Sequence, residues 1–196
     1  MSRFDNRSKE QFKKDVYFGT MIEKLFMDLF IDSCRKKQDV EILHYYDHGV
    51  ANDGSFIEEG VNTSGADYML ENFKYRDDWY DKLPLEVKWV PTYGKLTLKL
   101  GDLKAYQREK AAILFLYTTK KLDLKKPANH NLEKHKMKIL ANCKYINWGI
   151  MMPRTVDFIL NTCQDDIKPI PYMGNKPGII IPQSQFGSFF REETLL

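Results

Sequence analysis

Near its N-terminus the chain has the apolar periodicity of an amphipathic helix. Apolar side chains such as Ile22, Leu25 and Leu29 recur three or four residues apart, with charged residues between them. That spacing places them on one face of an α-helix, which can pack against a core while the charged face meets water. The pattern therefore predicts a long helix over residues 8–37.

The segments that follow have the patterns of β-strands. Residues 40–47 (VEILHYYD) are rich in β-forming side chains, and residues 66–73 (ADYMLENF) and 83–90 (LPLEVKWV) alternate as half-buried strands do. Residues 111–117 (AAILFLY) are continuously apolar, which is typical of a strand buried on both faces. The polar, glycine-bearing residues 48–65 predict a long loop.

The second half of the chain adds helices and a proline-rich end. Residues 100–110 have helix-forming composition, and residues 154–163 predict a helix that begins just after a proline. The apolar residues 145–151 lie before that helix. The order helix, strands, helix, strand, strand, helix predicts a mixed α/β fold. Four prolines between positions 169 and 182 predict an extended, turn-rich arm over residues 165–196.

Composition supports one domain rather than a disordered or membrane-spanning chain. The 196 residues are 43% hydrophobic and 29% charged, enough apolar material for a substantial core. We expect a single domain over residues 1–196, with a core at about 8–160 and an extension at about 165–196. No apolar run approaches the roughly 20 residues that cross a bilayer, and the charged N-terminus does not resemble a secretory signal. We expect a cytoplasmic protein that does not enter a membrane, and three cysteines without a CxxC pair fit reduced thiols there.

The candidate chemistry lies on two of the predicted strands. Glu86 and Lys88 are two residues apart, so they share one face of their strand, while apolar neighbours take the other. Asp67 begins the preceding predicted strand, and antiparallel pairing would bring its carboxylate close to that of Glu86. Two close carboxylates repel unless a cation lies between them, and hard oxygen ligands suit Mg²⁺ or Mn²⁺. The alternative is an ordinary surface ion pair between Glu86 and Lys88.

Two further polar residues lie on the predicted helices beside these strands. Glu23 interrupts the apolar stripe of the first helix, where a carboxylate is costly to bury without a partner. Gln107 lies in the helix that follows the Glu86 strand, where its amide could hold a phosphate or a metal-bound water. The alternatives are a solvent-reaching side chain for Glu23 and an ordinary exposed helix residue for Gln107.

Taken together, these residues resemble the PD-(D/E)XK nuclease superfamily. The resemblance rests on Asp67, on Glu86-Val87-Lys88 preceded by Pro84-Leu85, and on Glu23 and Gln107 in the flanking helices, and it spans roughly residues 12–117. It implies a restriction endonuclease-like αβββαβ core with a central mixed sheet flanked by helices. It also implies that Asp67 and Glu86 are ligands of Mg²⁺ or Mn²⁺, that Lys88 is the catalytic lysine, and that Glu23 and Gln107 assist.

Basic residues surround the candidate site in sequence and continue beyond the buried strand. Because the formal net charge is only +3, the distribution of charge is more informative than its sum. Gathered lysines supply salt-dependent contacts with phosphates, and Tyr93, Tyr106 and Tyr117 could stack or hydrogen-bond nearby. The alternative is a lysine-rich surface that serves solubility. The residues predicted to contact DNA are Lys95, Lys99, Lys104, Arg108, Lys120, Lys121, Lys125 and Lys126.

These observations favour a metal-dependent endonuclease that hydrolyses DNA phosphodiester bonds, of the restriction, repair or phage and mobile-element type. Because one site per chain cuts one strand, cutting both strands favours a homodimer. Two alternatives stay open at this point. One is a non-catalytic nucleic-acid-binding protein on the same fold, and the other is a structural or interaction protein that uses its proline-rich end.

Overall fold

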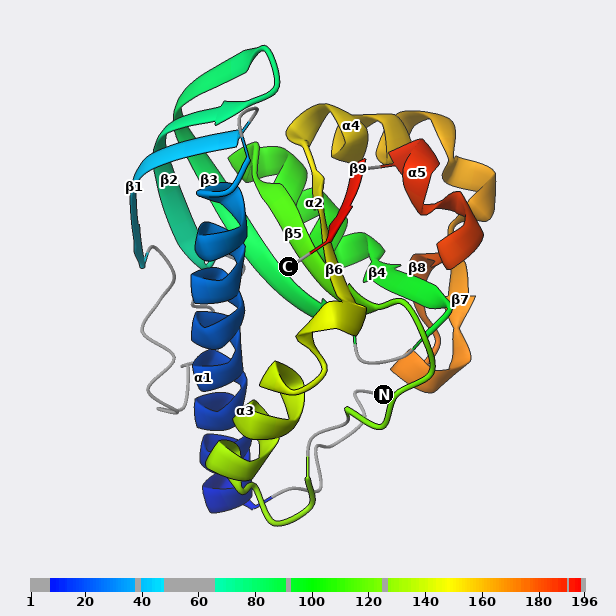
Figure 1. The fold of residues 1–196 in the computed structure, drawn as a ribbon. Coiled ribbons are helices and arrows are strands. Elements are labelled where there is room, and N and C mark those ends of the chain that lie inside the picture. The colour runs from blue at the N-terminus through cyan, green and yellow to red at the C-terminus, as the bar shows by residue number, and fades with distance from the viewer. Residues whose placement is uncertain are drawn as a thin grey trace.

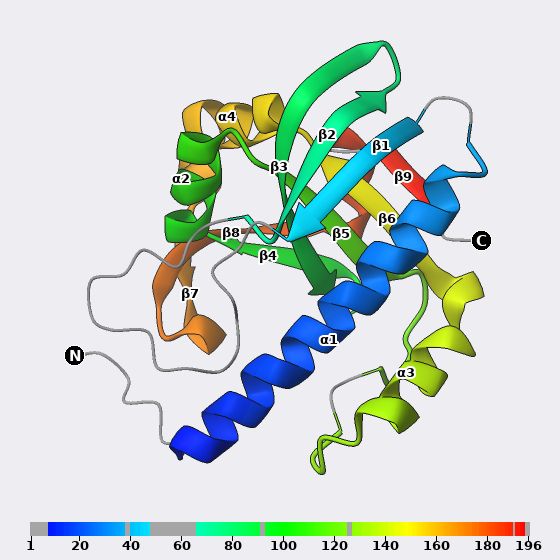
Figure 2. The same cartoon turned by 90° about the vertical axis from the view of Figure 1, so that its left-hand side faces the viewer.

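A mixed sheet flanked by helices on both faces forms the centre of the computed structural model (Figures 1 and 2). The structure describes residues 8–37, 40–47, 66–90, 93–124, 127–189 and 191–194. A six-stranded sheet has the order β1-β2-β3-β5-β6-β9, and a three-stranded sheet has the order β4-β8-β7. The strands are β1 (Val40–Asp47), β2 (Tyr68–Tyr75), β3 (Asp78–Val90), β4 (Lys95–Lys99), β5 (Ala112–Thr118), β6 (Ile146–Met151), β7 (Lys168–Ile170), β8 (Lys176–Pro182) and β9 (Arg191–Thr194). The α-helices are α1 (Lys9–Cys34), α2 (Leu100–Glu109), α3 (Leu132–Leu140), α4 (Pro153–Thr162) and α5 (Phe186–Phe189).

Helix α1 confirms the long N-terminal helix. Ser8 caps it, because its hydroxyl accepts a hydrogen bond from the backbone N–H of Gln11 at 3.1 Å. Its buried stripe includes Phe26 and Phe30, whose rings lie 4.6 Å from Trp89 on β3 and 5.0 Å from Trp148 on β6. One apolar core therefore joins α1 to one face of the sheet. No helix among the described residues has the length and apolar character needed to cross a membrane.

The hairpin of β2 and β3 differs from expectation in its turn. The strands expected over residues 66–73 and 83–90 leave residues 74–82 between them, but only Arg76 and Asp77 lie between Tyr75 and Asp78, which pair across the hairpin. Arg76 has a φ of 59°, in the left-handed region used by two-residue hairpin turns. The strand extends through polar residues because backbone pairing with β2 needs no apolar side chains, so β3 is longer than its apolar pattern indicates.

Strand β5 confirms the prediction of a strand buried on both faces. All of its residues, Ala112–Thr118, are buried, and β5 pairs in parallel with β3 and antiparallel with β6. The parallel pairing requires a crossover, which β4 and α2 provide. Helices α2 and α4 pack on the face of the sheet opposite α1, over a second apolar core (Figure 2).

The C-terminal segment corrects the expectation of an extended arm. Strand β8 pairs with β4 and β7, and β9 pairs with β6 at the edge of the large sheet. Ile179, Ile181 and Phe186 are buried in the second core. Pro169 and Pro182 are compatible with these strands because Pro169 lies on the edge strand β7 and Pro182 ends β8, where a missing N–H is tolerated.

Candidate active site

The candidate site lies where β2 and β3 separate. Strand β3 pairs with β2 only as far as Leu85, which faces Tyr68, and from Leu85 onward it pairs with β5 on its other side. The next step of the β2 register places Asp67 opposite Glu86. This pairing brings together two carboxylates that are 19 residues apart in sequence, as the antiparallel prediction required.

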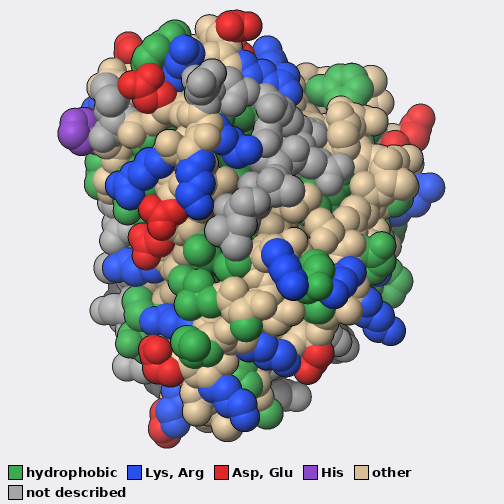
Figure 3. Space-filling view, viewed as in Figure 1, with side chains coloured by type: hydrophobic (Ala, Val, Ile, Leu, Met, Phe, Trp, Pro, Cys, Tyr) green, Lys and Arg blue, Asp and Glu red, His purple; other side chains and the backbone are tan. Residues whose placement is uncertain are grey.

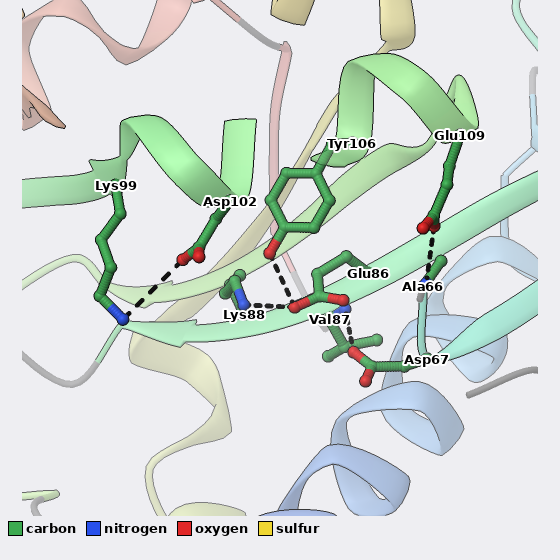
Figure 4. A network of polar contacts seen from close by, with 9 residues as sticks. All are labelled: Ala66, Asp67, Glu86, Val87, Lys88, Lys99, Asp102, Tyr106 and Glu109. Carbon is green, nitrogen blue, oxygen red and sulfur yellow. Dashed lines mark hydrogen bonds and ion pairs between the residues drawn. The ribbon is translucent and has the colours of Figure 1, made fainter. Parts of the chain in front are cut away.

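The alternation of β3 separates its core residues from its polar ones. Leu85 and Val87 are buried in the core beneath α1, whereas Glu86 and Lys88 lie on the face beneath α2. Glu86 is buried, with 8% of its surface exposed. Its Oε1 accepts hydrogen bonds from Lys88 Nζ and, at 2.9 Å, from the Tyr106 hydroxyl (Figure 4). A cation and a phenol on two elements thus fix one oxygen of this carboxylate.

Asp67 is held by the backbone of the strand opposite. Its Oδ2 accepts a hydrogen bond from the Val87 N–H at 2.8 Å. The residue before it is held as well, because the Ala66 N–H donates to Glu109 Oε2 at 3.1 Å. These two bonds tie the start of β2 to β3 and to the end of α2 (Figure 4). Asp67 is therefore positioned before any ligand binds.

Burial and neighbouring carboxylates raise the pKa values of two acidic side chains at the site, Asp67 and Glu23. Burial raises the pKa of Asp67 to about 7, and repulsion from Glu86 and Glu23 adds to the effect. Burial also raises the pKa of Glu23 on α1, partly offset by attraction to Lys88 and reinforced by repulsion from Glu86. Glu23 therefore belongs to the same electrostatic cluster, although it comes from the opposite side of the sheet.

Lys88 and Tyr106 keep their protons in this cluster. Burial alone would lower the pKa of Lys88, but Tyr106 and Glu86 beside it outweigh burial and raise that pKa. Burial raises the pKa of Tyr106, so its hydroxyl remains a hydrogen-bond donor to Glu86. Lys88 also lies 5.6 Å from the centroid of the Tyr106 ring, which favours the cationic form further. These contacts favour the cationic form of Lys88.

The chemistry of this donor set fits a small divalent cation. Asp67 and Glu86 offer hard carboxylate oxygens, and Glu86 Oε2 accepts no hydrogen bond from the described residues, as Figure 4 shows. Burial raises the pKa of Asp67 most, and repulsion from Glu86 and Glu23 adds to it; a bound cation would relieve that repulsion. Among the described residues, no three His, Cys, Asp or Glu side chains form a preformed ligand set. Mg²⁺ commonly needs only one or two carboxylates, because it retains several waters.

Four of the five predicted catalytic residues come together, and the fifth is used elsewhere. Asp67, Glu86 and Lys88 meet at the separation of β2 and β3, with Glu23 beside them. The amide of Gln107 instead donates to Asp157 Oδ1 on α4 at 2.8 Å, so it links two helices. The sequence reasoning assigned no role at the carboxylates to Tyr106, although Tyr106 lies three residues after the buried Leu103 on the same helical face. That spacing was the available signal.

The predicted basic residues lie in varied surroundings. Lys99 pairs with Asp102 at 3.9 Å, and Lys120 lies 3.3 Å from the centroid of the Tyr145 ring. Tyr117, proposed as a stacking residue, is buried against Phe186, so it cannot meet a base. Figure 3 shows Lys and Arg side chains dispersed over one face among acidic and apolar ones. Lys104, Arg108 and Lys121 are exposed, and Lys125 and Lys126 lie outside the described residues.

Comparisons with known proteins add no family to this description. No protein-family model, no curated protein and no solved structure matches the chain. The conclusions about function therefore depend on the residues and their arrangement.

Proposed function

We propose that this protein is a metal-dependent nuclease that hydrolyses DNA phosphodiester bonds. The observation that carries the proposal is the meeting of Asp67, Glu86 and Lys88 at the separation of β2 and β3. The order α1, β1, β2, β3, α2, β5 also agrees with the αβββαβ core of the PD-(D/E)XK nucleases, with β4 inserted before α2. A restriction endonuclease-like core is therefore part of the proposal.

Each side chain has a role that follows from its contacts. Asp67 and Glu86 would hold Mg²⁺ or Mn²⁺, which supplies positive charge to polarise a phosphodiester and acidify a bound water. Lys88 donates to Glu86 and also contacts the Tyr106 hydroxyl, so a remaining N–H can orient the attacking water or stabilise charge on a phosphate oxygen. Tyr106 keeps Glu86 in place. Glu23, whose pKa is raised, is a stronger base than an exposed glutamate and can accept a proton released at the site.

Cleavage of supercoiled plasmid in Mg²⁺, Mn²⁺ or EDTA tests the proposal. We expect the wild type to nick or linearise the plasmid with either metal and to be inactive in EDTA. Glu86→Gln should lose at least about 100-fold of that activity, because it removes a metal-holding charge. Glu71→Gln is the matched control, since Glu71 is a carboxylate on β2 that pairs with Lys82 at 3.6 Å, away from the cluster. Equal trace activity in the wild type and Glu86→Gln would show that the site is not catalytic.

A further inference from the structure

A basic surface with an anchored tyrosine lies on the three-stranded sheet beside the candidate site. The strands of this sheet, β4, β7 and β8, contain four lysines and no acidic residue: Lys95, Lys99, Lys168 and Lys176. On β4 the alternation is clear, because Leu96 and Leu98 are buried while Lys95, Thr97 and Lys99 are partly exposed. On β4 one face therefore packs on the core, and the other carries Lys95 and Lys99; the neighbouring Ile180 on β8 adds an apolar side chain that is 42% exposed.

Tyr172 is held against this outer face by two contacts. It belongs to the short 3₁₀-helix η3 (Pro171–Met173), which connects β7 to the turn before β8. Its hydroxyl and the Thr97 hydroxyl share a hydrogen bond at 2.6 Å, and Lys95 Nζ lies 4.6 Å from its ring centroid. The side chain nevertheless remains 53% exposed. An exposed ring held in one orientation loses little freedom when another flat group stacks on it.

The surface connects to the candidate site through α2. Lys99 ends β4 and lies 3.9 Å from Asp102 in the first turn of α2. Asp102 lies four residues before Tyr106 on α2, and the Tyr106 hydroxyl donates to Glu86 at 2.9 Å. Figure 4 shows the Lys99–Asp102 ion pair and the Tyr106–Glu86 hydrogen bond, with Asp102 and Tyr106 both on α2, and Figure 2 shows β4 and β8 beside α2. The three-stranded sheet and the candidate site therefore both border α2.

We propose that the Tyr172 surface binds a single-stranded segment of the DNA substrate; this inference rests on the proposed nuclease function. Lysines beside the ring bind backbone phosphates, and an unpaired base stacks on Tyr172. A base inside a duplex is stacked between its neighbours and cannot offer a face to a protein ring. The substrate class is therefore DNA that carries an unpaired segment, such as a flap, a fork or a gap, rather than fully paired duplex.

Fluorescence anisotropy in EDTA tests binding separately from cleavage. The probes are a labelled dT strand of about 20 nucleotides and a fully paired duplex of the same length. We expect the single strand to bind at least about 10-fold more tightly than the duplex, and Tyr172→Ala to weaken its binding by about 5- to 150-fold. Tyr172→Phe should stay within about threefold of the wild type, because the ring is kept.

Trp79→Ala is the matched control, because it also removes an exposed aromatic side chain. Trp79 is 58% exposed and also has a lysine over its ring, Lys74 at 5.5 Å, but it lies at the far end of β3. This variant should bind the single strand as the wild type does. The surface assignment is wrong if the duplex binds as tightly as the single strand, if neither binds, or if Tyr172→Ala binds normally.

The two proposals fail in different ways. Binding that requires Tyr172, together with no plasmid cleavage in Mg²⁺ or Mn²⁺, would overturn the nuclease proposal and leave the binding surface standing. Cleavage that requires Glu86, together with binding insensitive to Tyr172, would overturn the surface alone. Lys95→Ala provides a further check. Loss of one phosphate contact should reduce, by about one, the slope of the logarithm of the single-strand binding constant against the logarithm of the salt concentration.

Discussion

The carboxylate of Asp67 accepts a hydrogen bond from the backbone N–H of Val87 at 2.8 Å. Backbone pairing between β2 and β3 ends one step earlier, at Tyr68 and Leu85. The side chain therefore extends the ladder at the point where the strands part. The same contact holds Asp67 beside Glu86, where burial first and repulsion from Glu86 second raise the pKa of Asp67. At this point of the fold, burial and neighbouring carboxylates both oppose the ionisation of Asp67.

The first prediction concerns stability and pH in metal-free protein. Because the pKa of Asp67 is about 7 in the fold and near 4 in the unfolded chain, the folded state binds more protons between these values. The free energy of unfolding should therefore fall as pH rises from about 4 to 7, by at most about 4 kcal/mol from this residue. In Asp67→Asn that contribution disappears, so the variant should be more stable than the wild type at pH 8 in EDTA.

Urea denaturation at pH 5 and pH 8 measures this difference. Adding Mg²⁺ at pH 8 should stabilise the wild type and leave Asp67→Asn unchanged, because ligand binding to the folded state raises its stability. If Asp67→Asn is the less stable protein at pH 8, its carboxylate is not the destabilised group that we describe.

The second prediction separates metal binding from catalysis at Lys88. Replacing Lys88 by Met removes the ammonium that donates to Glu86 Oε1 and competes with a divalent cation for that carboxylate. Mn²⁺ should therefore bind at least as tightly to Lys88→Met as to the wild type, measured by calorimetry. Plasmid cleavage should fall by about 100-fold or more, since a fixed cation that stabilises developing charge is lost. Lys82→Met, a change on the exposed end of the same strand, should leave both measurements unaltered.

The third prediction concerns Tyr106 as a positioning residue. Tyr106→Phe removes the hydroxyl that donates to Glu86 at 2.9 Å and keeps the buried ring. A lost hydrogen bond to a charged group costs about 1.5–3 kcal/mol, so thermal unfolding should occur at a lower temperature. The Mg²⁺ concentration needed for half-maximal cleavage should also change, because Glu86 is less firmly held. If Tyr106→Phe is less stable but needs the same Mg²⁺ concentration as the wild type, Tyr106 contributes to stability and does not position Glu86 for the metal.

The fourth prediction tests whether the C-terminal strands belong to the fold. A Cβ added at Gly178 on β8 would lie 2.4 Å from the Leu98 carbonyl oxygen and 2.6 Å from Ile170 Cδ1. Gly178→Ala should therefore destabilise the protein by at least about 2 kcal/mol, because the Leu98 backbone cannot move aside cheaply. Gly101→Ala is the control, since Gly101 lies in α2 with no atom within 4 Å of its added Cβ. If Gly178→Ala lowers the free energy of unfolding no more than Gly101→Ala does, the pairing of β4 with β8 is contradicted.

Local pattern predicted the elements that hold the carboxylates, and tertiary pairing determined the rest. The alternation around Glu86 and Lys88 was sufficient to place them on one strand face, opposite Asp67. The contact of Gln107 with Asp157 could not be predicted, because it depends on α4 packing beside α2. Strand β4 was missed because its five residues hold only two apolar side chains, Leu96 and Leu98.

Prolines and lysines obscured two other parts of the fold. The proline-rich residues before Phe186 indicated an arm, yet backbone pairing with β4 makes β8 a strand whose isoleucines alternate into the core. Helix α3 was not predicted from its lysine-rich sequence, because only two of its residues, His135 and Ile139, are buried, four positions apart. In both cases a few buried positions specify the element, whereas the prolines or lysines around them are more typical of an irregular segment.

A crystal soaked in Mn²⁺ gives the most direct test of the central claim that this cluster is a metal centre. We predict an anomalous peak between the carboxylates of Asp67 and Glu86, within bonding distance of both, and no such peak in Asp67→Asn. If Mn²⁺ at a concentration that supports cleavage leaves the space between these carboxylates empty, the metal centre proposed for this protein is contradicted.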